Sequence, residues 1–383
     1  MALVKPDTTR LAKIRVIGIG GGGGNAINSM ISQDKIAGVE FIAINTDSQV
    51  LLSNLAPTKV QIGEKLTRGL GVGGNPELGK QSAEESREKI KELLLDSDMV
   101  FITAGMGGGT GTGATSIIAE IAKEVGALTI AIVTKPFAFE GARRSVVAEE
   151  GIDSIKDKVD TLLIIPNQRL MDVIDRKVTL LDAFRLADSV LSQGVQGISE
   201  IITQPGLINV DFADVKTIMS GAGSALLGIG TGVGEARAQM AARAAVASPL
   251  LDLSIEGAKG VLFNICGGPD LTMAEVDEAA RIIAEHCDAD ANIIFGASID
   301  QRLSDQVRIT VIATGFDETR ARLAQMTNVA VRPQVTTSDI SEDVPLGSMQ
   351  QQEEPEEPKL SEDDEFGEKF KIPAFLRQGR FGS

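Results

Sequence analysis

The chain has 383 residues, 43% of them hydrophobic, and a formal net charge of −16. This length predicts two domains and a tail, and the negative charge disfavours nucleic acid as a partner. The two cysteines, Cys266 and Cys287, are too few for a disulfide framework and indicate free thiols in a reducing compartment. The sequence shows neither a signal or transit peptide nor an apolar run of about 18 residues. We therefore expect a soluble, cytoplasmic protein without direct membrane insertion.

The first half of the chain alternates short apolar runs with stretches of helical periodicity. Apolar and β-branched residues predict strands over residues 13–20, 39–47, 98–105, 127–134 and 160–167. Helices are predicted over 25–33 and 82–95, the second with Ser82 and Glu85 as its capping box. Strands that alternate with helices are typical of a parallel sheet covered by helices.

A long helix is predicted between the two halves of the chain, over residues 177–202. Its apolar residues recur at helical spacing, at positions 181, 184, 187, 190, 191, 195 and 198. Beyond it, strands are predicted over 225–232, 260–268, 291–299 and 306–316. Thr272 and Glu275 form another capping-box pattern. The second half therefore predicts a smaller mixed α/β domain.

The composition changes after Pro333. Residues 333–383 carry twelve acidic and five basic residues, and Gln, Glu, Pro and Ser dominate residues 338–364. Such a composition predicts a disordered acidic linker, here assigned to residues 319–368. In residues 369–383 apolar and basic residues return together, a pattern that is typical of a partner-binding peptide.

Two glycine-rich segments each follow a predicted strand. The first is GIGGGGGNA at residues 18–26, and the second is AGMGGGTGTGA at residues 104–114. A glycine turn between a strand and a helix leaves backbone N–H groups free at the helix N-terminus, a geometry that binds phosphate. Two such segments indicate two loops that hold one polyphosphate, and Thr110 and Thr112 add hydroxyl donors.

Three kinds of phosphate site fit a glycine-rich turn. The spacing of Gly18, Gly20 and Gly23, with Asp47 at the end of the next strand, matches the dinucleotide-binding fingerprint. The G-x-x-x-x-G-K-[ST] loop of other nucleotide-binding proteins does not occur in the sequence. The third kind uses several glycine loops in place of a lysine, and the second glycine segment favours it. A single glycine pair would fit a tight strand–helix junction without a ligand as well as it fits a phosphate site.

The stretch GGGTGTG at residues 107–113 resembles the signature of the tubulin and FtsZ superfamily of GTPases. Four further stretches are similar to the FtsZ family of bacterial cell-division GTPases, namely residues 45–47, 66–79, 139–144 and 206–219. The resemblance implies a tubulin-like α/β fold in which a parallel-sheet GTP-binding domain is joined by a long central helix to a smaller α/β domain. The implied segments are a flexible N-terminus (1–10), the GTP-binding domain (11–176), the central helix (177–202) and a C-terminal activating domain (203–318).

The resemblance also implies which residues bind GTP or GDP. The phosphate groups are expected to contact Gly21, Gly22, Gly23, Gly24, Asn25, Gly107, Gly108, Gly109 and Thr110. Loop 71–76 is expected near the γ-phosphate, and Glu140 and Arg144 near the sugar and phosphates. Arg143 is an alternative to Arg144, because the two arginines are adjacent and spacing does not separate them. Mg²⁺ is implied by the triphosphate, not by a set of metal ligands in the sequence.

Phe184 and Asp188 are four residues apart on the predicted long helix and therefore share a face. An aromatic ring can stack on a base, and a carboxylate can accept hydrogen bonds from guanine N1–H and N2–H together. Adenine presents an acceptor at N1, so the carboxylate favours GTP over ATP. Without the resemblance, a core position for Phe184 and a capping or solvent-facing role for Asp188 are favoured. Asn25 and Asn167 are implied as further contacts to the base.

The glycine segments contain no lysine or arginine that could act in catalysis. The candidate catalytic residues lie far along the chain, in the stretch NVDFAD, at Asn209, Asp211 and Asp214. By resemblance, this stretch meets the nucleotide of the next subunit, so that head-to-tail assembly into open filaments activates hydrolysis. The alternative for either aspartate is a helix N-cap or a first-turn acid.

The sequence thus predicts a GTP-hydrolysing protein that polymerises into the filaments of the cell-division ring. The implied partners are further copies of the chain, and membrane-tethering and division-regulating proteins that bind residues 369–383. One other hypothesis is an NAD-dependent oxidoreductase with a Rossmann domain, against which the doubled glycine segment argues. Another is a cytoskeletal protein that binds GTP without turnover. His286, the one histidine, is expected to be structural.

Overall fold

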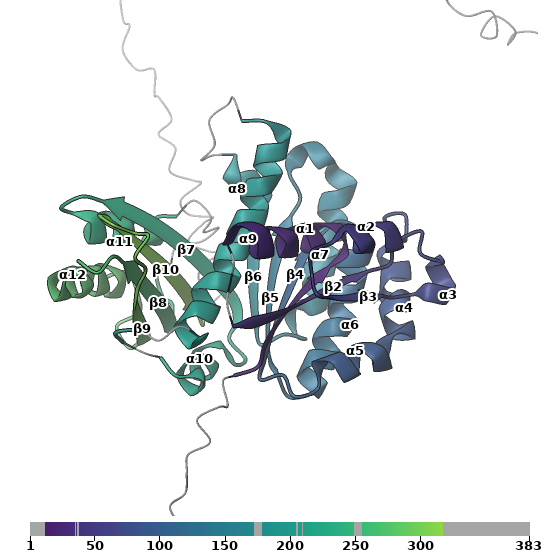
Figure 1. Cartoon of the computed structure of the whole chain (residues 1–383), viewed down its shortest axis with the longest axis horizontal. Coiled ribbons are helices and arrows are strands. Elements are labelled where there is room, and N and C mark those ends of the chain that lie inside the picture. The colour runs from purple at the N-terminus through teal and green to yellow at the C-terminus, as the bar shows by residue number, and fades with distance from the viewer. Residues whose placement is uncertain are drawn as a thin grey trace, which may run out of the picture. The chain divides into compact units, whose positions relative to one another are not determined.

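One continuous sheet organises the part of the chain that the structure describes. The computed structural model describes residues 12–34, 36, 38–171, 178–203, 206–208, 210–248 and 255–316. These residues form a ten-stranded sheet in the order β3-β2-β1-β4-β5-β6-β7-β10-β8-β9, with helices packed against both faces (Figure 1). Within these ranges, no helix is long and apolar enough to cross a membrane.

Parallel strands form the first part of the sheet. They are β1 (Ile14–Ile19), β2 (Val39–Asn45), β3 (Thr58–Gln61), β4 (Met99–Gly105), β5 (Leu128–Lys135) and β6 (Thr161–Pro166). Five of these strands confirm the prediction, whereas the short edge strand β3 was not expected. The strand order reverses between β1 and β4, and ligands of doubly wound sheets bind at the carboxyl ends of the strands beside such a reversal.

The second part of the sheet is mixed. It contains β7 (Gly223–Val233), β8 (Gly260–Gly267), β9 (Asn292–Ile299) and β10 (Gln306–Thr314). Strand β10 runs antiparallel to both β7 and β8, while β8 and β9 are parallel. Residues 161–163 of β6 pair with residues 223–225 of β7 in parallel register, so this short ladder joins the two parts into one sheet.

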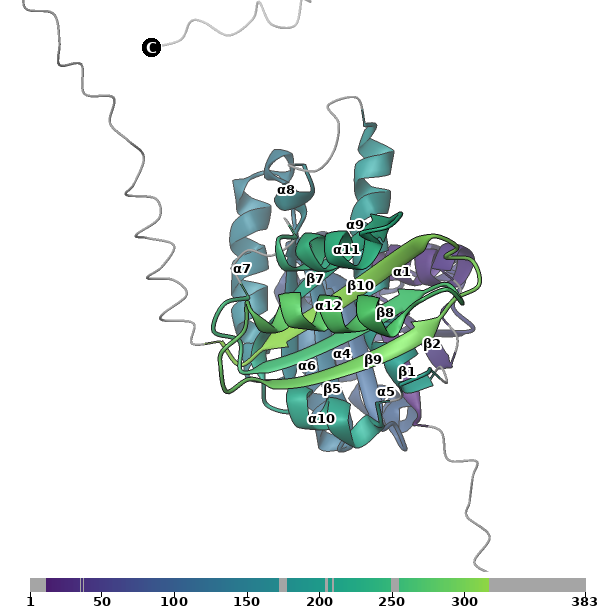
Figure 2. The same ribbon diagram turned by 90° about the vertical axis from the view of Figure 1, so that its left-hand side faces the viewer.

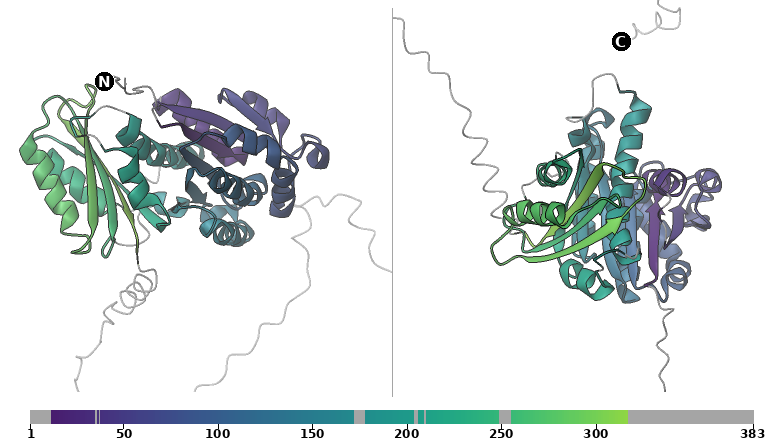
Figure 3. Two further views of the ribbon diagram at one scale, coloured as in Figure 1. Left: turned by 90° about the horizontal axis from the view of Figure 1, so that it is seen from below. Right: turned by 60° about the vertical axis from the view of Figure 1, so that its left-hand side comes forward.

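Each face of the sheet has its own set of helices. One face is covered by α1 (Gly20–Ser29), α2 (Ser48–Ser53), α9 (Leu180–Thr203) and α10 (Phe212–Met219). The other face of the first part is covered by α4 (Pro76–Glu85), α5 (Arg87–Leu94), α6 (Thr110–Glu124) and α7 (Ala142–Lys156). Against β7, β8 and β10 lie α11 (Arg237–Val246) and α12 (Met273–Ala284), on the side away from α9 (Figures 2 and 3). Short helical segments complete the fold: η1 (Met30–Asp34), α3 (Glu64–Thr67), η2 (Ala138–Glu140) and α8 (Asn167–Leu170).

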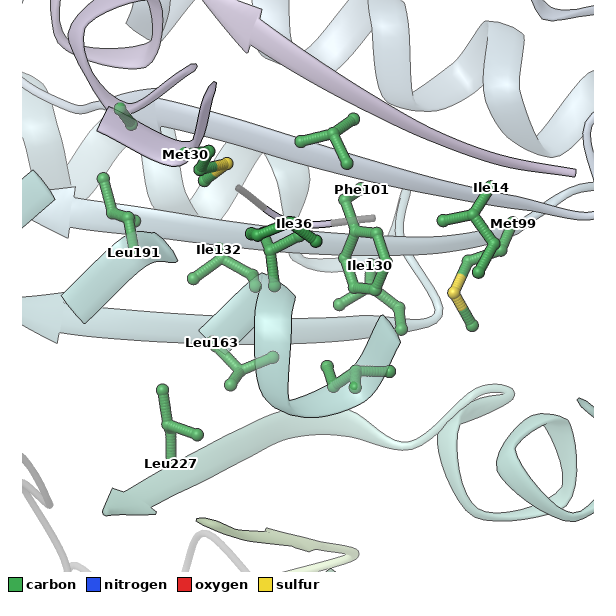
Figure 4. Packing of buried hydrophobic residues seen from close by; sticks show 14 of the residues in the cluster. Ile14, Met30, Ile36, Met99, Phe101, Ile130, Ile132, Leu163, Leu191 and Leu227 are labelled. Atoms are coloured by element: carbon green, nitrogen blue, oxygen red, sulfur yellow. The ribbon is translucent and has the colours of Figure 1, made fainter. Parts of the chain in front are cut away.

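The central helix α9 packs between the two parts of the sheet and confirms the predicted long helix. It has 24 residues and is therefore about 36 Å long at 1.5 Å per residue. Leu191 of α9 packs with Ile132 and Leu163 of the first part of the sheet and with Leu227 of the second (Figure 4). Because both parts bury apolar residues against α9, this helix fixes one relative to the other.

The predicted helix over residues 82–95 is wrong in its start and in its continuity. Helix α4 begins at Pro76, after Asn75, whose side chain accepts hydrogen bonds from the backbone of the first turn. Ser82 lies inside α4 and donates to the Leu78 carbonyl at 2.7 Å, so it caps nothing. The Asn-Pro pair supplies a stronger start signal than Ser82 does. By contrast, the capping box of Thr272 and Glu275 is confirmed at the start of α12.

The first glycine segment is helical, whereas the sequence suggested a turn before a helix that begins at Asn25. Helix α1 begins at Gly20, directly after β1. The glycines let this helix approach the sheet closely, because a Cβ atom on Gly23 would lie 2.3 Å from the carbonyl oxygen of Thr103 in β4. Close packing of the helix on the strands therefore explains part of the glycine run.

Candidate functional site

A cavity of about 590 Å³ opens at the carboxyl ends of the parallel strands. Its walls include Ile19, Asn45, Gly105, Pro136 and Asn167, which end or directly follow β1, β2, β4, β5 and β6. Of the residues singled out in the sequence, the lining contains Gly21, Gly22, Asn25, Gly108, Gly109, Thr110, Glu140, Arg144, Asn167, Phe184 and Asp188. A cavity of this volume and position accommodates a nucleotide.

Two helices begin at the wall of the cavity. Gly21 and Gly22 start α1, and Gly109 and Thr110 start α6. Neither helix has a side chain that caps its N-terminus. The first N–H groups of both helices are therefore available to a ligand, and two helix dipoles favour negative charge at the same place. This arrangement suits a polyphosphate.

Some of the expected phosphate contacts do not line the cavity. Gly23 is buried against β4, where a Cβ would meet the Thr103 carbonyl oxygen, and Gly24 is buried against Asn54 at the end of α2. Gly107 has φ +96°, and a Cβ there would lie 2.7 Å from the Arg144 carbonyl oxygen. Its N–H donates to the hydroxyl of Thr112 at 3.0 Å. These glycines shape the two segments, and Thr112 holds the second turn from inside instead of facing the cavity.

A hydroxyl pair extends the site beyond the residues that were expected, and the expected glycine loop also lines the cavity. The hydroxyls of Thr46 and Thr110 are 2.7 Å apart and buried, which ties the end of β2 to the start of α6. Asp47 caps α2 by accepting from the N–H groups of Gln49 and Val50. The loop at 70–74, with three glycines at positive φ, lines the same side of the cavity. The position of Thr46 at the end of a parallel strand, next to Asp47, is the signal that could have identified it.

Phe184 and Asp188 enter the cavity from one face of α9. The Phe184 ring meets Phe137 edge to face, with centroids 5.4 Å apart and an interplanar angle of 90°. Phe139 also contacts it edge to face, at 6.4 Å. Phe184 lines the cavity and 38% of the residue is exposed, so part of this side chain is accessible to a ligand. The aromatic cluster holds the ring in an orientation in which a base can stack on it.

Two hydrogen-bond acceptors, the Asp188 carboxyl and the Asn167 side-chain oxygen, belong to residues that line this end of the cavity. Burial raises the pKa of the Asp188 carboxyl to about 7. The Oδ1 atom of Asn167 is buried and has no hydrogen-bond partner among the described residues. A buried acceptor such as this one needs a donor. Guanine offers two donors, N1–H and N2–H, on the same edge of the base.

Glu140 and Arg144 form an ion pair one turn apart at the mouth of the cavity. Glu140 also accepts from the backbone N–H of Phe137 at 2.9 Å, which fixes its carboxylate. Arg143 is exposed and does not line the cavity. The geometry therefore favours Arg144 over Arg143 as the arginine that faces a ligand.

The acids expected in catalysis lie away from this cavity. Asp211 is the N-cap of α10, and its Oδ1 accepts from the Asp214 N–H at 2.8 Å. Both side chains are exposed, and neither lines the cavity. Asn209 lies outside the described residues. Within a single chain, the capping role is thus the one that Asp211 fulfils.

Among the described residues, no group of three or more His, Cys, Asp or Glu side chains could hold a metal ion. The acidic residues that line the cavity are Asp47, Glu140 and Asp188. His286 lies outside this cavity, in the turn after α12, with Nδ1 2.8 Å from the carbonyl oxygen of Ile282 near the end of that helix. At this cavity, the backbone N–H groups of the two helix N-termini and the guanidinium of Arg144 are groups that can hold the charge of an anionic ligand.

The fold and the site define the class of tubulin-like nucleotide-binding proteins. Residues 13–175 match the family model of the GTPase domain of the Tubulin/FtsZ family, and residues 223–317 match that of the C-terminal domain of the FtsZ family. An empty FtsZ dimer from M. jannaschii is 47% identical, with a TM-score of 0.78 over 81% of this chain and 90% of that one. CetZ2 from Haloferax volcanii, in a GTPγS-bound protofilament, is 22% identical, with a TM-score of 0.67 over 83% of this chain and 99% of that one.

The chain belongs to the FtsZ family, within the Tubulin/FtsZ GTPases. Membership confirms the tubulin-like α/β fold and implies that the cavity binds a guanine nucleotide. It does not favour the alternative of an NAD-dependent oxidoreductase, although the strand order of the first part also occurs in Rossmann folds.

Proposed function

We propose that this chain binds GTP with Mg²⁺, assembles head to tail into filaments, and hydrolyses the GTP with residues of the next subunit. The observation that supports this most strongly concerns the described residues that line the cavity: none of their acidic side chains is available as a base. Asp47 caps α2, Glu140 is paired with Arg144, and Asp188 lies at the base end. Hydrolysis needs a group that orients the attacking water, so that group is expected from outside this cavity.

The position of α10 fits a role in trans. The cavity lies at the N-terminal end of α9, whereas Asp211 follows its C-terminal end, and α9 is about 36 Å long with 24 residues. A carboxylate at the far end is badly placed for the chain's own γ-phosphate. In a stack of identical subunits, it would face the cavity of a neighbour. The CetZ2 relative, which was solved as a protofilament, shares the fold that such stacking requires.

The two ends of a subunit also offer apolar surface. Beside the cavity, Leu70 is 83% exposed and Phe139 is 58% exposed; near Asp211, Leu207 is 72% exposed. A contact between unlike ends is heterologous and produces open filaments. Burial of these side chains in such a contact would contribute to assembly through the hydrophobic effect.

The hydrolysis step then divides between two subunits. The N-termini of α1 and α6 and the guanidinium of Arg144 stabilise negative charge on the phosphates. Mg²⁺ arrives with GTP as part of the substrate and neutralises further charge. From the next subunit, Asp211 and Asp214 orient the water that attacks the γ-phosphate and accept its proton, with Asn209 as a polar helper. Assembly thereby switches hydrolysis on.

We place these filaments in the cytoplasmic ring at the division site. Residues 319–368 would act as an acidic linker and residues 369–383 as the peptide that binds membrane-tethering and division-regulating proteins. Both segments lie outside the described residues, so the proposal rests on their composition and on the family resemblance.

Light scattering and phosphate release, measured together after addition of MgGTP, test the proposed function. Both signals should rise with GTP, and neither should rise with ATP or NADH. Phosphate release per subunit should increase with protein concentration, because assembly completes the site. Scattering without phosphate release would contradict hydrolysis and favour a filament protein without turnover. Phosphate release that is independent of concentration would contradict activation by assembly.

A further inference from the structure

The glycine segment that begins α1 has no side chains with which to fix its own position. Residues 20–24 are all glycine, and glycine in a helix is less favourable than alanine by about 0.5–1 kcal/mol per residue. No side chain caps the N-terminus of this helix. A phosphate site made of backbone N–H groups nevertheless has to be held rigidly for strong binding.

Asn54 supplies a restraint from a neighbouring element. Its Nδ2 donates a hydrogen bond to the carbonyl oxygen of Gly24 at 2.8 Å. Its Oδ1 accepts from the N–H of Ala56 at 2.8 Å. Asn54 is only 6% exposed, so this amide is fixed at both ends and shielded from water, where a hydrogen bond is strengthened.

Gly24 and Asn54 also fit each other sterically. A Cβ atom on Gly24 would lie 3.2 Å from Nδ2 of Asn54, which is tighter than an ordinary contact. The glycine therefore leaves room for the amide at the position where the amide holds the helix. This contact gives a reason for Gly24, which does not line the cavity.

Helix α2 links this contact to the cavity. Asp47, the N-cap of α2, and Val50, in its first turn, line the cavity, and Asn54 is the C-cap of the same helix. A second bond lies next to it, where the N–H of Leu55 donates to Oδ1 of Asn28 on α1 at 2.7 Å, in a more exposed position. The end of α2 is thus attached to α1 at two points, of which one reaches the glycine segment.

We propose that Asn54 is a positioning residue for nucleotide binding: it holds the glycine segment of α1 in the conformation that presents N–H groups to the phosphates. The inference rests on the proposed binding of GTP in this cavity. It extends the site to a side chain that touches no ligand and acts through the Gly24 carbonyl. Loss of this one hydrogen bond should weaken GTP and GDP binding about fivefold.

Asn54→Asp is the most informative variant. It keeps the size of the side chain and the acceptor for the Ala56 N–H, but presents a second acceptor to the Gly24 carbonyl instead of a donor. A buried carboxyl has a raised pKa, and its protonated form donates again. The ratio of the variant's GDP dissociation constant to that of the wild type should therefore fall as the pH is lowered from about 8 to about 5.5. A merely structural role would not produce this pH-dependent recovery.

Asn28→Ala is the matched control, because it removes the neighbouring bond to Leu55 without touching the glycine segment. Dissociation constants for fluorescent GTP and GDP should change less than about twofold in Asn28→Ala, and rise about fivefold in Asn54→Ala and more in Asn54→Asp. Thermal unfolding of the empty proteins reports whether each variant is folded. If Asn54→Ala is unfolded, the nucleotide dissociation constants of Asn54→Asp at the two pH values still test the role of Asn54.

Wild-type affinity in a folded Asn54→Asp protein at about pH 8 would overturn the inference. An equal loss in Asn28→Ala would overturn it too, because the effect would then belong to the attachment of α2 and not to the contact with Gly24. The proposed function fails in a different way, since the wild-type chain itself would then bind neither GTP nor GDP.

Discussion

Asp188 lies one helical turn after Phe184 on α9, and both side chains line the same cavity. The Phe184 ring lies nearly perpendicular to the rings of Phe137 and Phe139, and burial raises the pKa of the Asp188 carboxyl to about 7. A base that stacks on Phe184 would place its Watson–Crick edge towards Asp188. This pair therefore gives a physical basis for guanine selection in the proposed function.

Asp188→Asn should weaken GTP binding by about 1–3 kcal/mol, because the amide NH₂ would face the donors of guanine and leave them unpaired. Rejection of ATP should weaken at the same time, since adenine offers an acceptor at N1. Dissociation constants for both nucleotides measure the change. Unaltered GTP binding together with unaltered ATP rejection would contradict the assignment of Asp188.

The affinity for GTP should fall as the pH is lowered below about 7. Burial raises the pKa of Asp188 to about 7 in the empty protein, whereas guanine requires the ionised carboxylate. Protonation therefore competes with binding, and the loss approaches tenfold per pH unit below that pKa. GTP titrations between about pH 5.5 and pH 8 measure the slope. In Asp188→Asn this pH dependence should disappear; an identical slope in the variant would assign the titration to another group.

The same shift has a consequence for the stability of the empty protein. The folded-state pKa of Asp188 lies above the value of 3.8 expected in the unfolded chain. Between these two values the native state binds the additional proton, so its contribution to stability is present at low pH and is lost as the pH rises through about 7. Thermal unfolding without nucleotide should therefore show a smaller decline over this range in Asp188→Asn than in the wild type.

The fold was largely predictable from the sequence because its signals are local. Strands β1, β4 and β5 are continuous apolar runs, as buried parallel strands are, and α9 has a clear helical period. The edge strand β3 has only four residues, TKVQ, and no such pattern. The start of α4 was misplaced because two overlapping capping patterns compete, and the Asn75–Pro76 pair is the one that the backbone uses.

The site was predictable where chemistry follows from one segment and less so where it depends on packing. The glycine segments identify a phosphate site, but spacing does not show that Gly23 faces the sheet and Gly24 faces Asn54 instead of the ligand. The pairing of Thr46 with Thr110 joins residues that are 64 positions apart. The contact between Asn54 and Gly24 spans 30 positions. The sequence does not show such pairs, because the residues are distant along the chain and the fold brings them together.

Glu275→Gln should lower the free energy of unfolding by about 2 kcal/mol near neutral pH. Arg237 is buried and holds both Glu275 and Asp270, and its guanidinium lowers the pKa of Glu275 to about 2. A lowered pKa stabilises the fold fully above about 4.5, the unfolded value, and that contribution is lost as the pH falls towards 2. Urea unfolding at pH 7 and pH 3.5 measures it. The difference between wild type and variant should shrink at the lower pH; a constant difference would contradict the ion-pair origin.

Truncation after Glu365 should leave GTP-driven assembly and phosphate release within about twofold of the full chain. Recruitment to vesicles that carry a membrane-tethering partner should be lost, because the expected partner-binding peptide, with its apolar residues Ile372, Phe375 and Leu376, is removed. Phe375→Ser in the full chain is the point variant for the same test. Equal recruitment of the full and truncated chains would contradict a role for this peptide.

Hydrolysis across the subunit boundary is the central claim, and a mixing experiment tests it most directly. Asp211→Ala should bind GTP and form filaments but release little phosphate. Gly108→Glu should not bind GTP, because a carboxylate would enter the phosphate site. A Cβ at Gly108 meets no atom within 4 Å, so the substitution causes no clash at that atom. The Asp211 of this variant stays intact. The two variants together should release phosphate faster than either alone, in filaments shown by labelling to contain both. A double variant, Gly108→Glu with Asp211→Ala, should give no such gain. No gain from the first mixture would show instead that the catalytic site is complete within one chain.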